Sequence, residues 1–199
     1  MSKTLTKEEI LYRQQFLSCC GFYKEKLDGD WGEKTDEAER DFFSMCRKIA
    51  DEEGKLDERT ERNLLSLQCE AQRAARRSVK AIRNAGIDAR IISATRTYPE
   101  QNALFRQGRF GNPGPVVTNA KAGQSWHNFG LAWDVGIFEN GKYVPDDVRP
   151  YKAAAQHGKV DGVEWGGDWK TFKDFPHYQF GTGGKGVSTA RKTFEAGGR

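Results

Sequence analysis

One segment of this 199-residue chain indicates its architecture: Ser125-Trp126-His127-Asn128-Phe129-Gly130-Leu131-Ala132-Trp133-Asp134. If residues 131–138 form a strand, successive side chains point to opposite faces of a sheet. One face then carries Leu131, Trp133, Val135 and Ile137, and the other carries Ala132, Asp134 and Gly136. The apolar face is expected to enter the core, whereas the second face is left open around Asp134. Because Gly130 permits a turn before the strand, His127 and Asp134 are expected to converge.

A second histidine also lies beside a carboxylate. His177 follows Asp174 by three residues and comes just before a strand expected at 178–180. Two histidines with one carboxylate form a known catalytic zinc set, and zinc lowers the pKa of a bound water to about 7. A remaining carboxylate can then accept its proton. These residue types are also common on polar surfaces, so the residues alone leave both interpretations open. His157 lies outside every motif and is expected at the surface.

The pattern on either side of this segment predicts helices interleaved with strands. Helices are expected at 70–85, at 97–108, at 152–156 and as one short element after residue 181. Thr97 and Glu100 form a capping box at the start of the second of these. Strands are expected at 88–95, 131–138 and 178–180. The chain is therefore expected to contain an α+β domain at 70–199, which holds the candidate chemistry.

Residues 1–69 have a different pattern, typical of short helices. Thr6 and Glu9 form a capping box for the first helix, and Gly21 can end it. A second helix is expected from about residue 35 to 49, and a third around residues 64–67. Similar Leu-Asp turns precede both, at 27–28 and 56–57, which indicates a degenerate internal repeat. Three short helices on one core are the expected result.

Charge is divided unevenly between these two parts. Residues 1–70 hold 12 Lys/Arg and 17 Asp/Glu, whereas the remainder holds 20 and 11, so the net charges are −5 and +9. A basic half fits an anionic partner such as nucleic acid, a membrane surface or an acidic polymer, and an ordinary solvated surface explains it equally well. No recognised nucleic-acid-binding motif accompanies the charge, so no nucleic-acid partner is expected.

Cysteine usage and apolar runs give no sign of export or membrane insertion. The four cysteines form no Cys-x-x-Cys pair and are expected to be reduced core residues. No apolar run approaches the roughly 20 residues that span a bilayer, so no stable membrane insertion is expected. The N-terminus lacks the apolar stretch of a signal peptide, and a start in the cytoplasm is therefore expected.

Four elements together resemble the LAS-type zinc peptidases. They are Ser125-x-His127-x-x-Gly130-x-Ala132-x-Asp134, Trp165-Gly166-Gly167-x-Trp169, Asp174-x-x-His177, and Thr95-Arg96-Thr97 with Gln101. The last is similar to a Tyr-Arg-Ser-x-x-x-Gln element, with Thr in place of both Tyr and Ser. The family includes VanY-like D-alanyl-D-alanine carboxypeptidases and phage L-alanyl-D-glutamate endopeptidases. The resemblance covers about residues 70–182 and implies a Hedgehog-like domain, a small antiparallel sheet flanked by helices.

The resemblance implies a metal site and a general base. His127, Asp134 and His177 would bind Zn²⁺, one ion per chain. Asp174 would be the catalytic base, because it stands three residues before the last ligand. Glu164 is the rival for this role, since some relatives place a glutamate close to that ligand.

The resemblance also implies roles near the substrate for four further residues. Arg96 would hold the scissile carbonyl or its developing oxyanion, because arginine stays charged and offers several donors. Gln101 would orient either the substrate or Arg96. Ser125 would hold the loop of His127 by hydrogen bonds. Trp165, next to Gly166-Gly167, would line a groove for sugar or peptide.

Residues 1–69 resemble the three-helix peptidoglycan-binding module that accompanies many wall hydrolases. The matching elements are Gly21-Phe22-Tyr23, Leu27-Asp28-Gly29, Trp31-Gly32 and Lys34-Thr35. The second half lacks the module's usual Asp-Gly-x-x-Gly turn. A wall-binding module and a helical cap that binds nothing therefore both remain open.

These resemblances imply a monomeric zinc endopeptidase that cuts the stem peptide of bacterial peptidoglycan, at the L-alanyl-D-glutamate bond. As a phage endolysin it would stay in the host cytoplasm until it is released to the periplasm and cell wall. A D-alanyl-D-alanine carboxypeptidase with the same zinc chemistry is the nearest alternative. A non-catalytic cell-wall-binding protein is the alternative from a different class.

Overall fold

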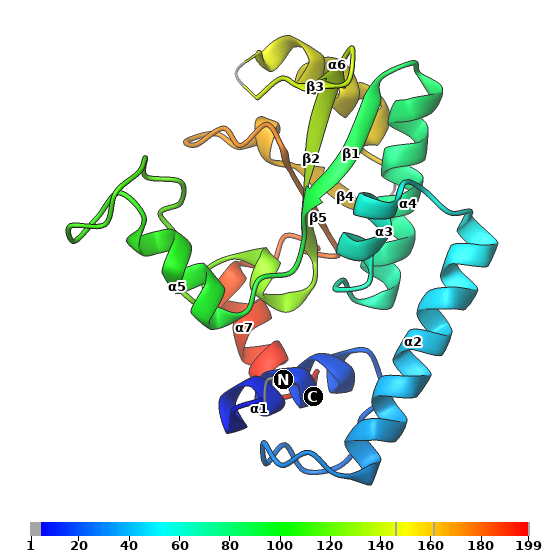
Figure 1. Cartoon of the computed structure of the whole chain (residues 1–199), viewed down its shortest axis with the longest axis vertical. Helices are drawn as coiled ribbons and strands as arrows, with labels where there is room; N and C mark the ends of the chain where they lie inside the picture. Colours follow the sequence, from blue (N-terminus) through cyan, green and yellow to red (C-terminus); the bar gives the residue numbers. More distant parts are fainter. Residues whose placement is uncertain (1–4, 146, 161, 199) are drawn as a thin grey trace.

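The computed structural model describes residues 5–145, 147–160 and 162–198. Its helices surround one small sheet (Figure 1). The helices are α1 (Lys7–Cys19), α2 (Glu33–Glu53), α3 (Glu58–Leu64), α4 (Cys69–Asn84), α5 (Tyr98–Arg106), α6 (Val148–Gly158) and α7 (Val187–Glu195), with short 3-10 helices η1 (Trp126–Phe129) and η2 (Gly166–Asp168). The strands are β1 (Asp88–Ser93), β2 (Ala132–Glu139), β3 (Lys142–Tyr143), β4 (Val163–Trp165) and β5 (His177–Phe180). The predicted α+β class is confirmed.

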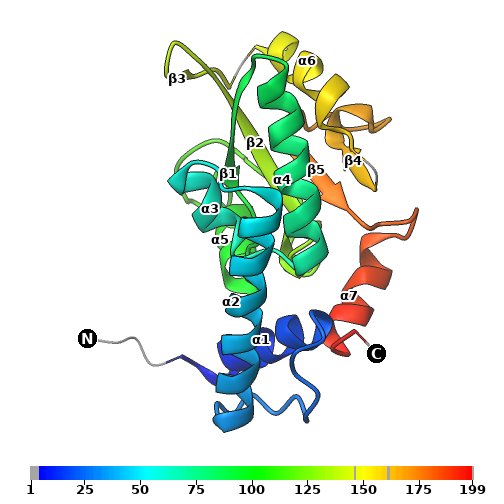
Figure 2. The same cartoon turned by 90° about the vertical axis from the view of Figure 1, so that its right-hand side faces the viewer.

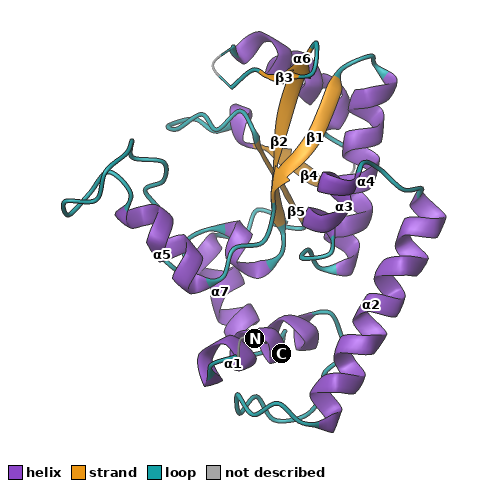
Figure 3. Ribbon diagram, in the orientation of Figure 1, coloured by secondary structure: helices purple, strands orange, loops and turns teal. Residues whose placement is uncertain are grey.

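The sheet is antiparallel throughout. Its strand order is β1-β2-β5-β4, and the two-residue β3 pairs with the end of β2. Helix α4 runs along one face of this layer, where it packs against β1, β2 and β5, and α6 packs on α4 (Figure 3). The opposite face is the one on which polar side chains gather.

The alternation along β2 explains how the sheet is oriented. Trp133, Val135 and Ile137 are at most 1% exposed and belong to the same apolar cluster as Val79 and Ile82 of α4. The residues between them point to the other face, because successive side chains of a strand alternate. The predicted apolar face of this strand is therefore confirmed, and Asp134 lies on the face away from α4.

The first three helices do not share one core, contrary to the sequence-based expectation. Helix α3 packs on β1, and its Leu64 belongs to the cluster formed by α4 and the sheet. Helices α1 and α2 share a second cluster, in which the rings of Phe16 and Phe42 meet edge to face at 5.3 Å. Phe129 of η1 and Phe194 of α7 complete it. Helix α3 is seven residues long and directs its apolar side to the sheet, so it cannot also pack on α1. The division between residues 69 and 70 and the binding of glycan stay predictions.

The second cluster fixes the segment that carries His127. In Figure 2, α1 and α7 lie together beyond one end of the sheet. The hydroxyl of Tyr12 donates to the carbonyl of Asn128 at 2.9 Å. Gln68 donates through its side chain to the carbonyl of Phe129 at 2.7 Å and through its backbone to that of Gly130 at 2.9 Å. The N-terminal helices are thus part of the scaffold of η1.

Local signals in the sequence have mixed outcomes. The capping boxes of α1 and α5 are both formed. The strand β4 was not predicted, because its three residues alternate around an exposed glutamate.

Among the residues described, no helix has the length and apolar character that crossing a bilayer requires. The four cysteines carry free thiols, and Cys46 is buried.

Gly130 is expected to be essential for stability. Its φ of +69° is a left-handed conformation, and an added Cβ would lie 2.7 Å from the Phe16 ring. Gly130→Ala is expected to lower the free energy of unfolding by about 2–4 kcal/mol, from backbone strain and overpacking together. Gly21 is the matched control, because it has a φ of +82° and no atom within 4 Å of an added Cβ. Gly21→Ala should cost about 1 kcal/mol. Equal losses in chemical denaturation would show that the contact with Phe16 is unimportant.

Candidate metal centre

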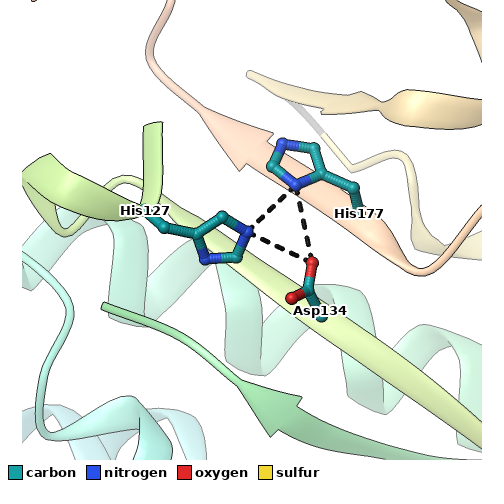
Figure 4. Close-up of side chains that lie close together, drawn as sticks. All are labelled: His127, Asp134 and His177. Carbon is teal, nitrogen blue, oxygen red and sulfur yellow. Dashed lines mark hydrogen bonds and ion pairs between the residues drawn. The ribbon is translucent and has the colours of Figure 1, made fainter. Parts of the chain in front are cut away.

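Three side chains from distant parts of the sequence converge on the face of the sheet away from α4 (Figure 4). His127 comes from η1, Asp134 from β2 and His177 from β5. His127 Nε2 lies 3.1 Å from His177 Nδ1 and 3.2 Å from Asp134 Oδ1. His177 Nδ1 lies 3.5 Å from the same oxygen. Over the described parts of the chain, these three form the group of His, Cys, Asp or Glu side chains placed to hold a metal ion.

Backbone geometry explains the convergence. Asp134 and His177 are direct partners in the antiparallel pairing of β2 with β5, so their side chains emerge side by side on one face. Gly130 ends η1 in a left-handed conformation and returns the chain toward β2. The backbone N–H of Arg96 donates to the carbonyl of His127 at 3.0 Å and secures this turn.

A neighbour holds the second ring nitrogen of each histidine. His127 Nδ1 lies 2.6 Å from the carbonyl oxygen of Ala94, which can only accept, so Nδ1 donates and Nε2 keeps its lone pair. His177 Nε2 lies 3.0 Å from Oε1 of Gln179 and donates to it. Two nitrogen lone pairs and a carboxylate oxygen then face one point. Metal-binding histidines are usually oriented by contacts of this kind.

The spacing of these atoms fits a metal ion in tetrahedral geometry. Ligands at zinc distances of about 2.0–2.1 Å lie roughly 3.3 Å apart in a tetrahedron. The three observed separations are 3.1, 3.2 and 3.5 Å. Two imidazoles and one carboxylate form a donor set of catalytic zinc sites, which keep the fourth position for water or substrate. The residues present therefore fit a zinc ion.

The electrostatics of the cluster favour positive charge. Burial would raise the pKa of Asp134, but His127, His177 and Arg96 outweigh it and hold that pKa well below its usual range. Burial lowers the pKa of His127 despite the opposing effect of Asp134. Burial also lowers the pKa of His177, but Asp134 and Asp174 outweigh it, and the net shift is upward. The carboxylates that attract a proton to His177 would equally attract a cation.

Known peptidases resemble this chain in sequence. The peptidase M15 family described as D-alanyl-D-alanine carboxypeptidase matches residues 118–180, which contain all three converging side chains. The peptidoglycan L-alanyl-D-glutamate endopeptidase CwlK of Bacillus subtilis (strain 168) is 39% identical over 110 residues, which cover 50% of this chain and 64% of that protein. The L-alanyl-D-glutamate peptidase of Listeria phage A118 is 30% identical over 135 residues, which cover 65% of this chain and 43% of that protein.

A solved structure shows the same architecture. The L-Ala D-Glu endopeptidase ChiX of Serratia marcescens matches with a TM-score of 0.51 and 25% identity, over 66% of this chain and 93% of that chain. The resemblance to the LAS-type peptidases is confirmed. The chain spans less than two thirds of the length of the two curated relatives.

Arg96 lies against the three converging side chains, with Gln101 behind it. Arg96 Nη2 donates to Asp134 Oδ2 at 2.6 Å and lies 3.2 Å from His127 Nε2. Gln101 has no exposed surface; its Oε1 lies 3.5 Å from Arg96 Nη1, and its Nε2 donates to the carbonyl of Ala120 at 2.8 Å. A fully buried side chain cannot touch a substrate. Of the two roles predicted for Gln101, the geometry therefore favours orientation of Arg96.

Asp174 lies beside the metal centre. Its N–H donates to the carbonyl of Gly166 at 3.2 Å, and its own carbonyl accepts from His177 N at 3.3 Å. A Cβ at Gly166 would lie 2.4 Å from the Asp174 carbonyl oxygen, so this close approach requires glycine. Burial and the nearby Asp134 raise the pKa of Asp174, against the opposing effects of His177 and Arg96. A carboxyl with a raised pKa next to a metal centre is suited to accept a proton.

Glu164, the rival for the role of base, contacts Gln179 and Thr182. It stands on β4 opposite Gln179 of β5, accepts from Gln179 Nε2 at 2.9 Å, and also accepts from the hydroxyl of Thr182. Within the described residues, no hydrogen bond or ion pair joins Glu164 directly to the three converging side chains. Its link to His177 runs through Gln179.

The two tryptophans on either side of Gly166-Gly167 have different surroundings. Trp165 is 6% exposed; its ring packs on Phe175, and its Nε1 donates to the Phe175 carbonyl at 2.7 Å. The prediction that Trp165 lines a groove is wrong, because the alternation along β4 turns it into the core. Trp169 is the tryptophan beside the site, with ring centroids 5.0 Å apart from His177. Ser125 holds the His127 loop through its carbonyl, which accepts from Asn128 N at 3.0 Å.

The sequence did not predict the roles of two buried amide side chains near the site. Asn128 donates to the carbonyl of Arg96 at 2.8 Å and accepts from Gly123 N at 3.0 Å, so it ties three loops together. Gln179 contacts His177 directly. A signal existed for Gln179, because residues two apart on a strand share a face. No comparable signal existed for Asn128, since an asparagine next to a turn usually serves that turn.

Loading the site with zinc should release a proton from His177. The pKa of this histidine is raised above 6.5 in the metal-free protein, and a metal ligand must be deprotonated. The apparent zinc affinity, measured by competition with a chelator of known affinity, is expected to fall as the pH falls and His177 becomes protonated. His127→Ala should abolish stoichiometric binding. A zinc affinity that does not change with pH would contradict the assignment of His177.

Proposed function

We propose that the chain is a zinc-dependent endopeptidase that cleaves the L-alanyl-D-glutamate bond of the peptidoglycan stem peptide. The observation that carries this proposal is the convergence of His127, Asp134 and His177 at separations that suit one tetrahedral zinc ion. The substrate is suggested by the relatives, since CwlK, the Listeria phage A118 protein and ChiX are all named for the L-alanyl-D-glutamate bond.

Each residue of the site has a role in the proposed reaction. His127 Nε2, His177 Nδ1 and a carboxylate oxygen of Asp134 would hold the ion. Zinc bound there would supply a Lewis acid and lower the pKa of water to about 7. Asp174 accepts a proton from the attacking water and passes it to the leaving amine. Arg96 stabilises the negative charge that develops on the scissile carbonyl oxygen, since its guanidinium stays charged and has donors beyond the one directed at Asp134.

D-alanyl-D-alanine carboxypeptidase activity is the second candidate. It is favoured by the description of the family that matches residues 118–180. The two activities require the same ion and base and differ in which peptide bond reaches the site. They are therefore separated by the products.

We also propose a biological setting, which the phage relative supports. The protein works as a monomer in host lysis, as an endolysin that remains in the host cytoplasm until it is released to the periplasm and cell wall. Peptidoglycan is its partner. The helices of residues 1–69 contribute contacts to the wall, which binding of isolated sacculi by an Asp174→Asn variant would test in the absence of cleavage.

Digestion of purified Gram-negative peptidoglycan tests the activity. The fragments are analysed by mass spectrometry with and without a zinc chelator. New amino-terminal glutamate that disappears on chelation is the expected result. Loss of terminal D-alanine alone would assign carboxypeptidase activity to the protein in place of endopeptidase activity. If folded, zinc-loaded protein left the peptidoglycan intact, the result would favour a non-catalytic wall-binding protein.

Substitution of Asp174 tests the assignment of the base. Asp174→Asn should retain zinc and lose about 10²–10⁴-fold in kcat, because a positioned general base contributes on that scale. Asp168→Asn is the control, because Asp168 lies on the nearby η2, is exposed and pairs with Lys159. The kcat of this variant should equal that of the wild type. Full activity of Asp174→Asn beside an inactive, zinc-loaded Glu164→Gln would transfer the role of base to Glu164.

A further inference from the structure

A chain of side chains leads from the metal centre to the surface of the sheet. His177 Nε2 lies 3.0 Å from Gln179 Oε1, and Gln179 Nε2 lies 2.9 Å from Glu164 Oε2. The hydroxyl of Thr182 donates to the other oxygen of Glu164. His177, Gln179 and Thr182 are each at most 4% exposed, whereas Glu164 is exposed. The chain therefore joins a buried ring to an exposed carboxylate through one buried amide.

Each link in this chain has a single permitted direction. An ionised carboxylate accepts hydrogen bonds and cannot donate them. Glu164 therefore requires the NH₂ group of Gln179 on its side, which turns the amide oxygen toward His177. An amide oxygen also only accepts, so His177 must carry its proton on Nε2. The lone pair of Nδ1 is then free, and Nδ1 is the atom that faces His127 and Asp134.

The alternative arrangement shows what Glu164 prevents. Without a carboxylate partner, the amide of Gln179 can turn over and present its NH₂ group to Nε2 of His177. The ring would then carry its proton on Nδ1, which points into the metal centre and would block a cation there. Burial makes this choice consequential, because His177 and Gln179 are each 4% exposed and buried polar groups require hydrogen-bond partners.

The two histidines differ in this respect. His127 is oriented by the backbone carbonyl of Ala94, which has no second orientation. His177 depends on side chains alone. Both oxygens of Glu164 are occupied, by Gln179 and Thr182, which suits a structural task better than proton transfer.

We propose that Glu164 and Gln179 are positioning residues that fix the tautomer of His177 and so make Nδ1 a metal ligand. The proposal rests on the zinc site of the proposed function, but it concerns metal binding and the state of the ring rather than the bond that is cut. It places Glu164 in the site without making it the base.

Nitrogen-15 NMR of the imidazole rings tests the proposal without zinc or substrate. In metal-free wild type at a pH where His177 is neutral, the proton should be on Nε2. In Glu164→Gln and Gln179→Ala, the Nδ1-protonated form should become populated. The control variants Glu139→Gln and Gln156→Ala alter exposed side chains away from this chain and should leave the tautomer unchanged. A wild-type His177 protonated on Nδ1 would overturn the proposal.

Zinc affinity is the second readout, measured by competition with a chromophoric chelator. Glu164→Gln and Gln179→Ala should bind zinc about 10- to 100-fold more weakly, which is the usual effect of losing a partner of a metal-bound histidine. The controls should match wild type. Unchanged affinity in both test variants would refute the proposal.

An exchange of the two side chains provides a rescue. In Glu164→Gln/Gln179→Glu, a carboxylate accepts from His177 Nε2 and the amide at 164 donates to that carboxylate, so the direction of every link is kept. Gln179→Glu alone sets two carboxylates against each other, and its zinc affinity should fall further than that of the double variant. Recovery in the double variant supports the proposal, whereas a double variant as weak as the worse single variant would contradict it.

The proposed function and this inference can fail separately. The wild-type protein could bind zinc and carry the proton of His177 on Nε2 but fail to cut peptidoglycan. That result would refute the peptidase function and support the positioning role. If the wild type cuts peptidoglycan but the test variants keep its zinc affinity and tautomer, the positioning role is refuted and the peptidase function stands.

Discussion

Asp134 and His177 lie opposite each other in the antiparallel pairing of β2 with β5, and the rest of the site is arranged around that pair. A shift of one residue in the pairing would turn one of these side chains into the core. The register is secured on the opposite face, where the neighbouring partners Trp133 and Tyr178 are buried and stack with an interplanar angle of 9°. Burial of apolar surface on one face therefore sets the geometry of the ligands on the other.

The supports of this pair come from several parts of the chain. Ala94 and Gln179 orient the two imidazoles, and Arg96 lies against the carboxylate of Asp134. Helix α1 contributes through Tyr12, which binds the carbonyl of Asn128 within η1. Arg96 and Asp134 form a partly buried ion pair, with side chains that are 19% and 15% exposed. Substitutions of either residue are therefore expected to affect folding as well as chemistry, and the positions that separate the two effects are Asp174 and Glu164.

The sequence was most informative where a local pattern decides the outcome. The alternation along 131–138 predicted the apolar face that packs on α4. The open face expected around Asp134 is not confirmed, because Ala132 and Gly136 are buried and Asp134 is partly buried. The capping boxes at Thr6 and Thr97 marked the starts of two helices correctly. Arrangements that depend on tertiary contacts were not predictable in this way. Helix α3 has an apolar side that suits either α1 or the sheet, and only the folded chain shows that it packs on β1.

The same distinction between local patterns and tertiary contacts holds for the candidate site. The motif spacing predicted the three converging side chains and favoured Asp174 over Glu164 as the base. It could not show that Glu164 contacts Gln179, because that contact depends on how β4 pairs with β5. Tryptophan gave the least reliable signal, since a groove and a core both suit its ring. Trp165 is in the core and Trp169 is beside His177. Trp165 sits at a buried position of β4, and Trp169 follows the turn of η2.

Anomalous diffraction at the zinc edge from crystals of the zinc-loaded protein tests whether these three side chains hold the ion. One peak per chain is expected, at about 2.0–2.2 Å from His127 Nε2, His177 Nδ1 and an oxygen of Asp134. A peak bound through Nε2 of His177, or one that lies away from these three side chains, would refute this zinc site.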